Sequence, residues 1–356
     1  MPNSELMPIG VFARRTGLTP SALRFYADSG LLPPARTDPV SGYRYYGADQ
    51  VARAVELRRL RQIAMPLGAV EAVLDAGPDD SARLIDEHVA KVLEDAEAVR
   101  QRAAVIKSSL ANVPGVPIAT LKGPVLADAI EQVLTATAPD PGMPVLGAVR
   151  IEATREAVTL TATDRYRLAT RTLVPAEPAA SAWAATVSGD GLRAAVSAVR
   201  RSMLVRVEAA SHGIRLRTAD GKDQHCGLLS EEFPDHRLML ASLSEVTTRV
   251  TVPKDLLLGA LEAHPDDCLS LVVTRDGLKA LAADDGPPGF SLPAAVTGQT
   301  LRVSFELTTL YPAVSTAIGP DVMLDLRGPD QPVTVRSADR GDLTTLAMPV
   351  KPDHPA

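Results

Sequence analysis

The sequence predicts a multidomain fold: an all-α winged helix-turn-helix domain at the N-terminus, one long dimerisation helix, and then two α+β domains. Three observations predict it. Short amphipathic helices separated by a glycine turn lie within 7–76, and one apolar heptad pattern runs through 78–112. Alternating strands mixed with amphipathic helices then fill 118–356. At 356 residues the chain is also too long for a single ordinary domain.

The composition excludes several classes of protein. A net charge of −6 argues against nucleic-acid binding over the whole surface, so any DNA contact has to be local. No apolar run approaches the roughly 20 residues of a membrane span, and the N-terminus lacks a signal pattern, which predicts a cytoplasmic protein without membrane contact. Cys226 and Cys268 lie far apart without metal-ligand spacing, so we expect two reduced thiols and neither a metal nor a cofactor.

The helix-turn-helix is predicted at the start of the chain. PIGVFARR (8–15) forms a short helix, Gly17 makes the turn, and Thr19 caps a second helix that has Pro20 at its first position. Small and polar side chains on the second helix suit approach to a DNA major groove. The residues expected to be exposed there are Ser21, Ala22, Arg24 and Tyr26.

A wing is predicted at 33–46, where prolines stiffen the entry and a glycine permits a tight turn. Tyr43 and Arg44 suit phosphate contact, because a phenol hydroxyl and a guanidinium fork both donate hydrogen bonds to phosphate oxygens. Tyr45 or Tyr46 is expected to pack the wing onto its own helices, and Phe25 is expected to face the core.

The long helix predicted within 77–113 carries apolar residues at alternating steps of four and three, with charged residues on its other faces. This heptad pattern favours a coiled-coil contact with a second copy, although an amphipathic helix packed on its own domain is an alternative. NVPGVP, at 112–117, ends the helix and indicates a linker. The predicted seam comprises Ile85, Val89, Val92, Ala96, Val99, Ala103, Ile106 and Leu110.

The stretch from Ile9 to Val70 resembles the MerR-type transcriptional regulators through T..ALR.Y...GLL.P.R....GYR.Y...D. The resemblance implies a homodimer joined by an antiparallel helix pair. It also implies double-stranded promoter DNA, distorted so that an overlong spacer comes into register for RNA polymerase. Metal and redox sensors of this family use cysteines at the end of the dimer helix, and this chain has no cysteine before Cys226. With the resemblance added, the predicted DNA-binding residues are Thr19, Ser21, Arg24, Tyr26, Tyr43 and Arg44.

The remainder of the chain repeats helix and strands twice, which predicts two α+β units at about 118–243 and 244–351. The full set of predicted domains is 1–76, 77–113, 114–243 and 244–356. Asp164–Arg167 and Asp235–Arg237 indicate turn and ion-pair residues, and 344–352 indicates an edge strand. The six histidines are scattered and SGDG at 188–191 lacks a phosphate-loop lysine, so no catalytic residue and no enzyme is expected.

ATDRYRLA, EFPDHR and LAMPVKP occur in the order and spacing of the bacterial DNA polymerase sliding clamp, which 118–351 resembles in its second and third domains. The resemblance implies a peptide- and inhibitor-binding cleft between those domains. Arg165 and Tyr166 replace a glycine and a histidine, and Leu238 replaces an arginine, so ligand preference does not carry over. The matching cleft residues are Thr163, Arg165, Tyr166, Arg167, Leu168, Pro234, Leu238, Met239, Leu346, Met348, Pro349 and Val350.

Three functions are open on this basis. The first is a dimeric regulator whose clamp-like region senses a small molecule or peptide, for example a clamp-targeting antibiotic. The second is an adaptor that brings clamp-interacting replication or repair proteins to a DNA site. The third, a clamp that encircles DNA, is disfavoured because the helices that would face phosphates are nearly neutral, LRAAVSAVRR alone being basic.

Overall fold

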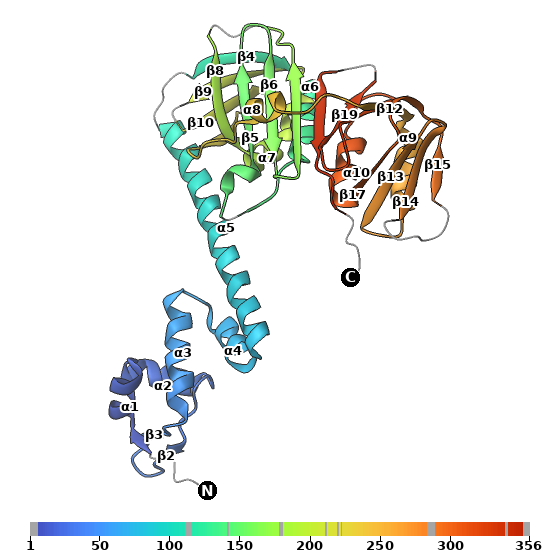
Figure 1. Cartoon of the computed structure of the whole chain (residues 1–356). Helices are drawn as coiled ribbons and strands as arrows, with labels where there is room; N and C mark the ends of the chain where they lie inside the picture. The colour runs from blue at the N-terminus through green and yellow to red at the C-terminus, as the bar shows by residue number, and fades with distance from the viewer. Residues whose placement is uncertain are drawn as a thin grey trace. The chain divides into compact units, whose positions relative to one another are not determined.

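The computed structural model describes residues 6–110, 115–140, 142–177, 181–210, 212–218, 221, 223–282, 289–338 and 341–351 (Figure 1). The chain divides into two compact units, Met1–Glu97 and Ala98–Ala356. Side chains at 97, 101, 104, 105, 108–110 and 282 lie outside the description, and so does Leu110 of the predicted seam.

The N-terminal unit is helical with a small antiparallel sheet of order β1-β3-β2. Gly17 ends α1 at φ 72°, a backbone conformation that favours glycine, and this makes the turn into α2. Its elements are β1 (Met7–Pro8), α1 (Ile9–Thr16), α2 (Pro20–Asp28), β2 (Arg36–Thr37), β3 (Arg44–Tyr46), α3 (Gln50–Gln62), α4 (Leu67–Asp75) and the start of α5 (Pro78–Leu110).

One aromatic pair holds the wing onto the helices of this unit. The ring of Tyr46 stacks on Phe12 with centroids 4.6 Å apart, and its hydroxyl donates to the Leu23 carbonyl at 3.2 Å. Both rings are fully buried, which confirms that Tyr46 packs the wing onto its own helices. Two other aromatic predictions were wrong: Phe25 is 55% exposed, and Tyr26 is only 8% exposed.

Helix α5 carries an apolar stripe that the single chain leaves largely uncovered. Ile85 packs against the core of the N-terminal unit, but Val89, Val92, Val99 and Ile106 are exposed, Val99 at 62%. The alternative in which the seam packs on its own domain therefore holds for Ile85 and not for these four exposed residues. A coiled coil with a second copy stays a prediction.

The C-terminal unit repeats one pattern of strands and helices. The first repeat contains β4 (Val116–Lys122), α6 (Gly123–Leu134), a 3-10 turn η1 (Pro144–Gly147), β5 (Ala148–Ala153), β6 (Val158–Thr163), β7 (Arg167–Leu173), β8 (Trp183–Ser188), α7 (Gly189–Arg201), β9 (Leu204–Ala210), β10 (Gly213–Thr218) and β11 (Gln224–Leu229). The short helix α8 (His236–Ala241) leads out of it.

The second repeat contains β12 (Thr248–Pro253), α9 (Lys254–Glu262), β13 (Cys268–Thr274), β14 (Gly277–Ala282), β15 (Phe290–Leu292), β16 (Ala295–Gly298), β17 (Leu301–Glu306), α10 (Leu307–Ser315), β18 (Asp321–Leu326), β19 (Val333–Ser337) and β20 (Leu343–Ala347). Each repeat buries its own apolar cluster, which agrees with the predicted internal repeat. The exact domain boundaries remain predictions.

A single sheet crosses both repeats. Its order is β16-β12-β18-β19-β20-β7-β6-β5-β8-β11-β10-β9-β4, and β15-β14-β13-β17 forms a second sheet. The crossing point is the antiparallel pair β7–β20, in which Leu168 faces Leu346. The prediction of an edge strand at 344–352 was wrong, because β20 has β19 on one side and β7 on the other.

A buried carboxylate organises the sheet of the second repeat. Asp325 on β18 is fully buried and accepts hydrogen bonds from Arg249 Nε at 2.5 Å and from Arg336. Burial by itself raises the pKa of the Asp325 carboxyl, but the two arginines outweigh burial and hold that pKa below its usual range.

We predict that Asp325→Asn lowers the free energy of unfolding by about 1–3 kcal/mol at pH 7, because an amide cannot accept two charge-assisted hydrogen bonds. Because the carboxyl pKa is lower in the folded state, its stabilisation is present above about pH 4 and is lost as pH falls through the folded value. Urea unfolding of wild type and variant should therefore differ at pH 7 and converge in acid.

The matched control is Arg200→Ala, which removes ion pairs between exposed side chains and should leave the unfolding midpoint unchanged. A constant difference between Asp325→Asn and wild type from pH 7 to pH 3 would contradict the assignment.

Candidate DNA-binding and effector sites

Helix α2 presents one polar face to solvent. The Thr19 hydroxyl oxygen accepts from the Ala22 amide at 3.1 Å and caps the helix, as predicted. Leu23 and Tyr26 are buried on the inner face. The exposed residues recur at spacings of three and four along the outer face: Ser21, Arg24, Phe25 and Asp28.

The wing lies against this face through Arg44. Its guanidinium forms an ion pair with Asp28 at 2.7 Å and donates to the Arg24 carbonyl at 2.9 Å. Arg44 is thus tied to the helix that carries Arg24, so the two predicted phosphate contacts are neighbours.

The tip of the wing is held by Asp38. Its carboxylate accepts from the amides of Val40 at 2.9 Å and Ser41 at 2.8 Å. Hydrogen bonding from Ser41 is the largest cause that holds the pKa of Asp38 below its usual range. Tyr43 is exposed at the wing and meets Tyr45 edge-on, with ring centroids 5.5 Å apart.

The structure brings Ser21, Arg24 and Arg44 together at the outer face of α2. Tyr26 was expected on that face and lies beneath it. Sequence reasoning missed Phe25, whose side chain belongs to the exposed stripe. The signal was available, since Phe25 lies four residues after Ser21 and one turn before Asp28.

The turn between β6 and β7 forms the first part of the predicted effector site. Asp164 is buried, and its Oδ1 accepts from the amides of Tyr166 at 3.0 Å and Arg167 at 2.7 Å. Its Oδ2 accepts from Arg167 Nε at 2.9 Å, which confirms the predicted turn and ion pair. The Thr163 hydroxyl donates to the Arg167 carbonyl at 2.8 Å.

The β7–β20 pair brings the two ends of the predicted site together. Leu168 and Leu346 are cross-strand partners and both are buried, so they lie beneath the surface of the predicted site and are not exposed to a ligand. The Met348 amide donates to the Tyr166 carbonyl at 2.8 Å, and the side chains of both residues are exposed. Beyond them, the Val350 amide donates to the Ser304 carbonyl at 2.8 Å, so the segment through Pro349 is fixed at both ends.

Helix α8 supplies the third part of the predicted site. Asp235 caps it by accepting from the Leu238 amide at 3.0 Å. Arg237 is an ion-pair residue as predicted, but its partner is Glu152 on β5, at 3.1 Å. Leu238, at 68%, and Met239 are exposed, and Pro234 precedes the cap. The described contacts place α8 on β5, which lies two strands from β7 in the sheet.

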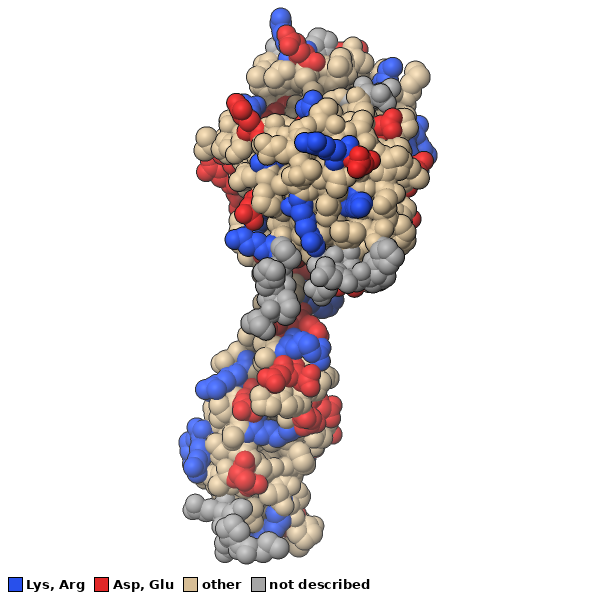
Figure 2. Space-filling model, turned by 45° about the vertical axis from the view of Figure 1, so that its right-hand side comes forward, with Lys and Arg blue, Asp and Glu red and all other residues tan. Residues whose placement is uncertain are grey.

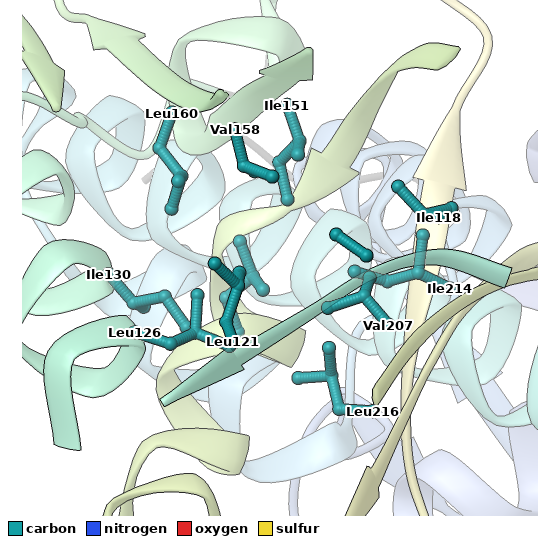
Figure 3. A pocket seen from close by; sticks show the side chains of 12 residues that line it. Ile118, Leu121, Leu126, Ile130, Ile151, Val158, Leu160, Val207, Ile214 and Leu216 are labelled. Atoms are coloured by element: carbon teal, nitrogen blue, oxygen red, sulfur yellow. The ribbon is translucent and has the colours of Figure 1, made fainter. Parts of the chain in front are cut away.

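A cavity of the first repeat lies elsewhere, between α6, α7 and the sheets (Figure 3). Its lining is apolar, with side chains such as Ile130, Leu160 and Leu216 pointing toward one another. Such a gap offers no polar group to orient a ligand. We assign it to the core of the repeat.

Helix α7, the one clamp-like helix that was predicted to be basic, has one of its three arginines paired with acids. Arg200 on α7 pairs with Asp128 at 2.5 Å and Glu131 at 2.6 Å, and both acids lie on the neighbouring helix α6. On the face of the clamp-like region in Figure 2, basic and acidic side chains are interspersed. Arg193 and Arg201 on α7 are exposed, so this helix keeps part of its positive charge.

Three observations concern other kinds of site. In the described parts of the chain, no helix combines the length and apolarity needed to cross a membrane. The same residues hold no cluster of three or more metal-ligating side chains. Cys226 and Cys268 are not joined in a disulfide, and burial raises the pKa of the Cys226 thiol to about 12, which makes that thiol unreactive.

Two protein families match the chain. The MerR HTH family regulatory protein matches residues 7–77, and the central domain of the DNA polymerase III beta subunit matches residues 120–235. The chain therefore has a MerR helix-turn-helix domain at its N-terminus and a DNA polymerase III beta clamp-like region at its C-terminus. This is the domain content of a MerR-type DNA-binding transcriptional regulator with a clamp-like region, and regulators of this family are typically not enzymes.

Particular proteins resemble each part. Transcriptional regulator BrlR of Pseudomonas aeruginosa is 31% identical over 112 residues, which cover 30% of this chain and 42% of BrlR. The beta sliding clamp of Streptomyces coelicolor is 27% identical over 257 residues, which cover 67% of this chain and 68% of the clamp. The solved DnaN sliding clamp of Pseudomonas aeruginosa bound to griselimycin shares the fold, with a TM-score of 0.61, 18% identity and 67% of each chain covered. The match to BrlR covers less than half of the length of that protein.

We predict that Arg24→Ala and Arg44→Ala each weaken binding to a mixed-sequence 30-base-pair duplex and lower the slope of log K against log salt by about one. Each change removes one cation from the α2 face. Phe25→Ala should leave that slope unchanged, because it removes no charge, and should alter preference among duplex sequences.

The control for this measurement is Arg83→Ala. Arg83 lies on α5, far from α2 in the sequence, and is paired with Asp80 and Glu87. Equal slopes for Arg24→Ala, Arg83→Ala and wild type would exclude α2 as the DNA-binding helix.

Proposed function

We propose that this protein is a dimeric transcriptional regulator of MerR type whose clamp-like region binds an effector and thereby alters promoter DNA. The observation that carries the proposal is the order of parts in one chain. A helix-turn-helix domain with an exposed polar face precedes a helix with an exposed apolar seam, and a clamp-like region follows.

The exposed seam of α5 supports the dimer. Val89, Val92, Val99 and Ile106 recur with heptad spacing, and burial of such side chains in a helix pair is favourable. The proposed pairing is antiparallel, as the resemblance to MerR-type regulators implies. A second copy would place two α2 faces on one double-stranded promoter.

The clamp-like region is proposed as the effector-binding part rather than as a sliding clamp. One of the three arginines of α7 pairs with acids on α6, and the other helices expected to face DNA carry few or no cations, which argues against DNA encirclement. Exposed apolar side chains lie at the predicted site instead, on the β6–β7 turn, after β20 and on α8: Tyr166, Met348, Leu238 and Met239.

The proposed effector is an apolar ligand of the kind that binds clamps. A sliding clamp that shares this fold has been solved with griselimycin bound. A sensor that resembles the target of such a compound could respond to it. Effector binding would change how the dimer deforms promoter DNA for RNA polymerase, a deformation that costs several kcal/mol and depends on the contacts made.

An adaptor that binds clamp-interacting replication or repair proteins is the second candidate. Leu168 and Leu346 keep an apolar floor beneath Met348, which favours binding of apolar peptide side chains. Arg165, Tyr166 and Leu238 differ from the residues of clamps at the matching positions. These differences disfavour binding of the usual clamp-binding peptides and therefore favour the regulator over the adaptor.

We predict that Val99→Glu converts the dimer to a monomer, because it places like charges in the seam. Sedimentation of the full chain should show the change, and DNA affinity should fall with it. Arg102→Glu, on another face of α5, is the control and should stay dimeric. A Val99→Glu dimer that binds DNA normally would exclude α5 as the dimer contact.

We predict that griselimycin at a hundredfold excess over its Kd stabilises the protein by about 2.7 kcal/mol. In a region of this size that corresponds to a rise in Tm of about 5–10 °C. Met348→Ala should weaken the effect, whereas Met203→Ala, which truncates another exposed methionine, should not. The compound should also change transcription from a promoter that the protein binds.

The regulator hypothesis is contradicted if griselimycin alters neither the melting temperature nor promoter activity. Stabilisation by clamp-binding peptides alone, with capture of the proteins that carry them, would favour the adaptor.

A further inference from the structure

The turn at the centre of the effector site holds an arginine in a conformation that favours glycine. Arg165 has φ 78°, and Ala64 is the only other non-glycine residue with positive φ among the residues described. A non-glycine residue in this region is strained. The strain is maintained by the neighbouring hydrogen bonds of Asp164, which fix the amides on the C-terminal side of Arg165.

The contacts of the Arg165 side chain do not offset the free-energy cost of this backbone conformation. Its Nη2 lies 3.4 Å from Asp140 Oδ2 and 2.6 Å from Met143 Sδ. The Arg165 side chain is 55% exposed, and an exposed ion pair contributes less than the strain of a left-handed non-glycine residue costs. Glycine at this position would be more favourable in the unliganded fold.

One apolar side chain contacts the guanidinium, and two more belong to the same part of the site. Met143, Tyr166 and Met348 are all exposed. Met143 contacts Arg165 directly, and Tyr166 is the next residue in the chain, with its carbonyl bound to the Met348 amide at 2.8 Å. The site therefore presents one largely exposed cation together with three exposed apolar side chains.

We propose that Arg165 determines effector specificity by binding a carboxylate of an otherwise apolar ligand. The guanidinium would bind the ligand carboxylate through paired hydrogen bonds and release Asp140. Tyr166 and Met348 would contact the apolar part of the ligand. The inference rests on the proposed effector function of this site. It names the chemistry of the ligand: a hydrophobic peptide with a free carboxyl terminus, or a small aromatic acid.

The test measures binding of two probe pairs to the full chain by calorimetry. One pair is acetyl-Gly-Leu-Gly-Leu-Phe as free acid and as amide, and the other is N-acetylphenylalanine and its amide. Wild type should bind at least one acid about tenfold more tightly than its amide. The pair that shows the difference identifies the source of the carboxylate, a peptide terminus or a small acid.

Arg165→Gly should abolish this preference and also raise Tm by about 2–4 °C, since it relieves the strained turn. Arg165→Lys should keep part of the preference, because it keeps the charge but loses the fork. Asp140→Asn is the matched control on the other side of the ion pair. It removes the competing carboxylate, so acid binding should tighten while the preference remains.

Equal binding of acid and amide overturns the inference and leaves the effector function standing. Failure of both pairs to bind also overturns it, as does an Arg165→Gly protein that keeps the preference. If the acids bind as expected but leave DNA binding and transcription unchanged, the carboxylate site stands and the regulatory function fails.

Discussion

The antiparallel pairing of β7 with β20 is the interaction on which the clamp-like region depends. Backbone hydrogen bonds between strands that are far apart in sequence join the two repeats into one sheet. The ion pair between Arg171 and Asp342, at 2.7 Å, reinforces the same joint, and the arginine side chain is buried. Because the proposed effector site takes residues from the end of each strand, its geometry follows directly from this register.

Buried carboxylates paired with arginines fix the local structure of the same region at two places. Asp164 fixes the β6–β7 turn through Arg167, and Asp325 joins three strands through Arg249 and Arg336. A buried carboxylate without such partners would be costly, so each of these pairs specifies a local geometry. The turn at Arg165 is the clearest case, since the bonds of Asp164 hold a strained backbone that the side chain itself does not stabilise.

The charged side chains of the helix-turn-helix domain and of the clamp-like region bear on which of them contacts DNA. Arg24 and Arg44 meet at the outer face of α2, where Arg44 also pairs with Asp28, and Arg200 in the clamp-like region pairs with two acids on α6. An acidic protein can contact DNA in this way through one local face. An effector can change that contact only if it binds one conformation of the regulator more tightly than another.

The sequence by itself determined the order of parts, the Gly17 turn, the Thr19 cap, the long α5 and the two repeats, because these follow from local periodicity, caps and short motifs. The tertiary structure alone decided that β20 is an inner strand, that Arg237 pairs with Glu152, and that Arg165 adopts a positive φ. The exposure of Phe25 was available from the sequence, because the helical spacing from Ser21 places Phe25 on the outer face of α2. Strand partners such as Arg171 and Leu343 are also remote in the chain, and no local pattern specifies which edge another strand will cover.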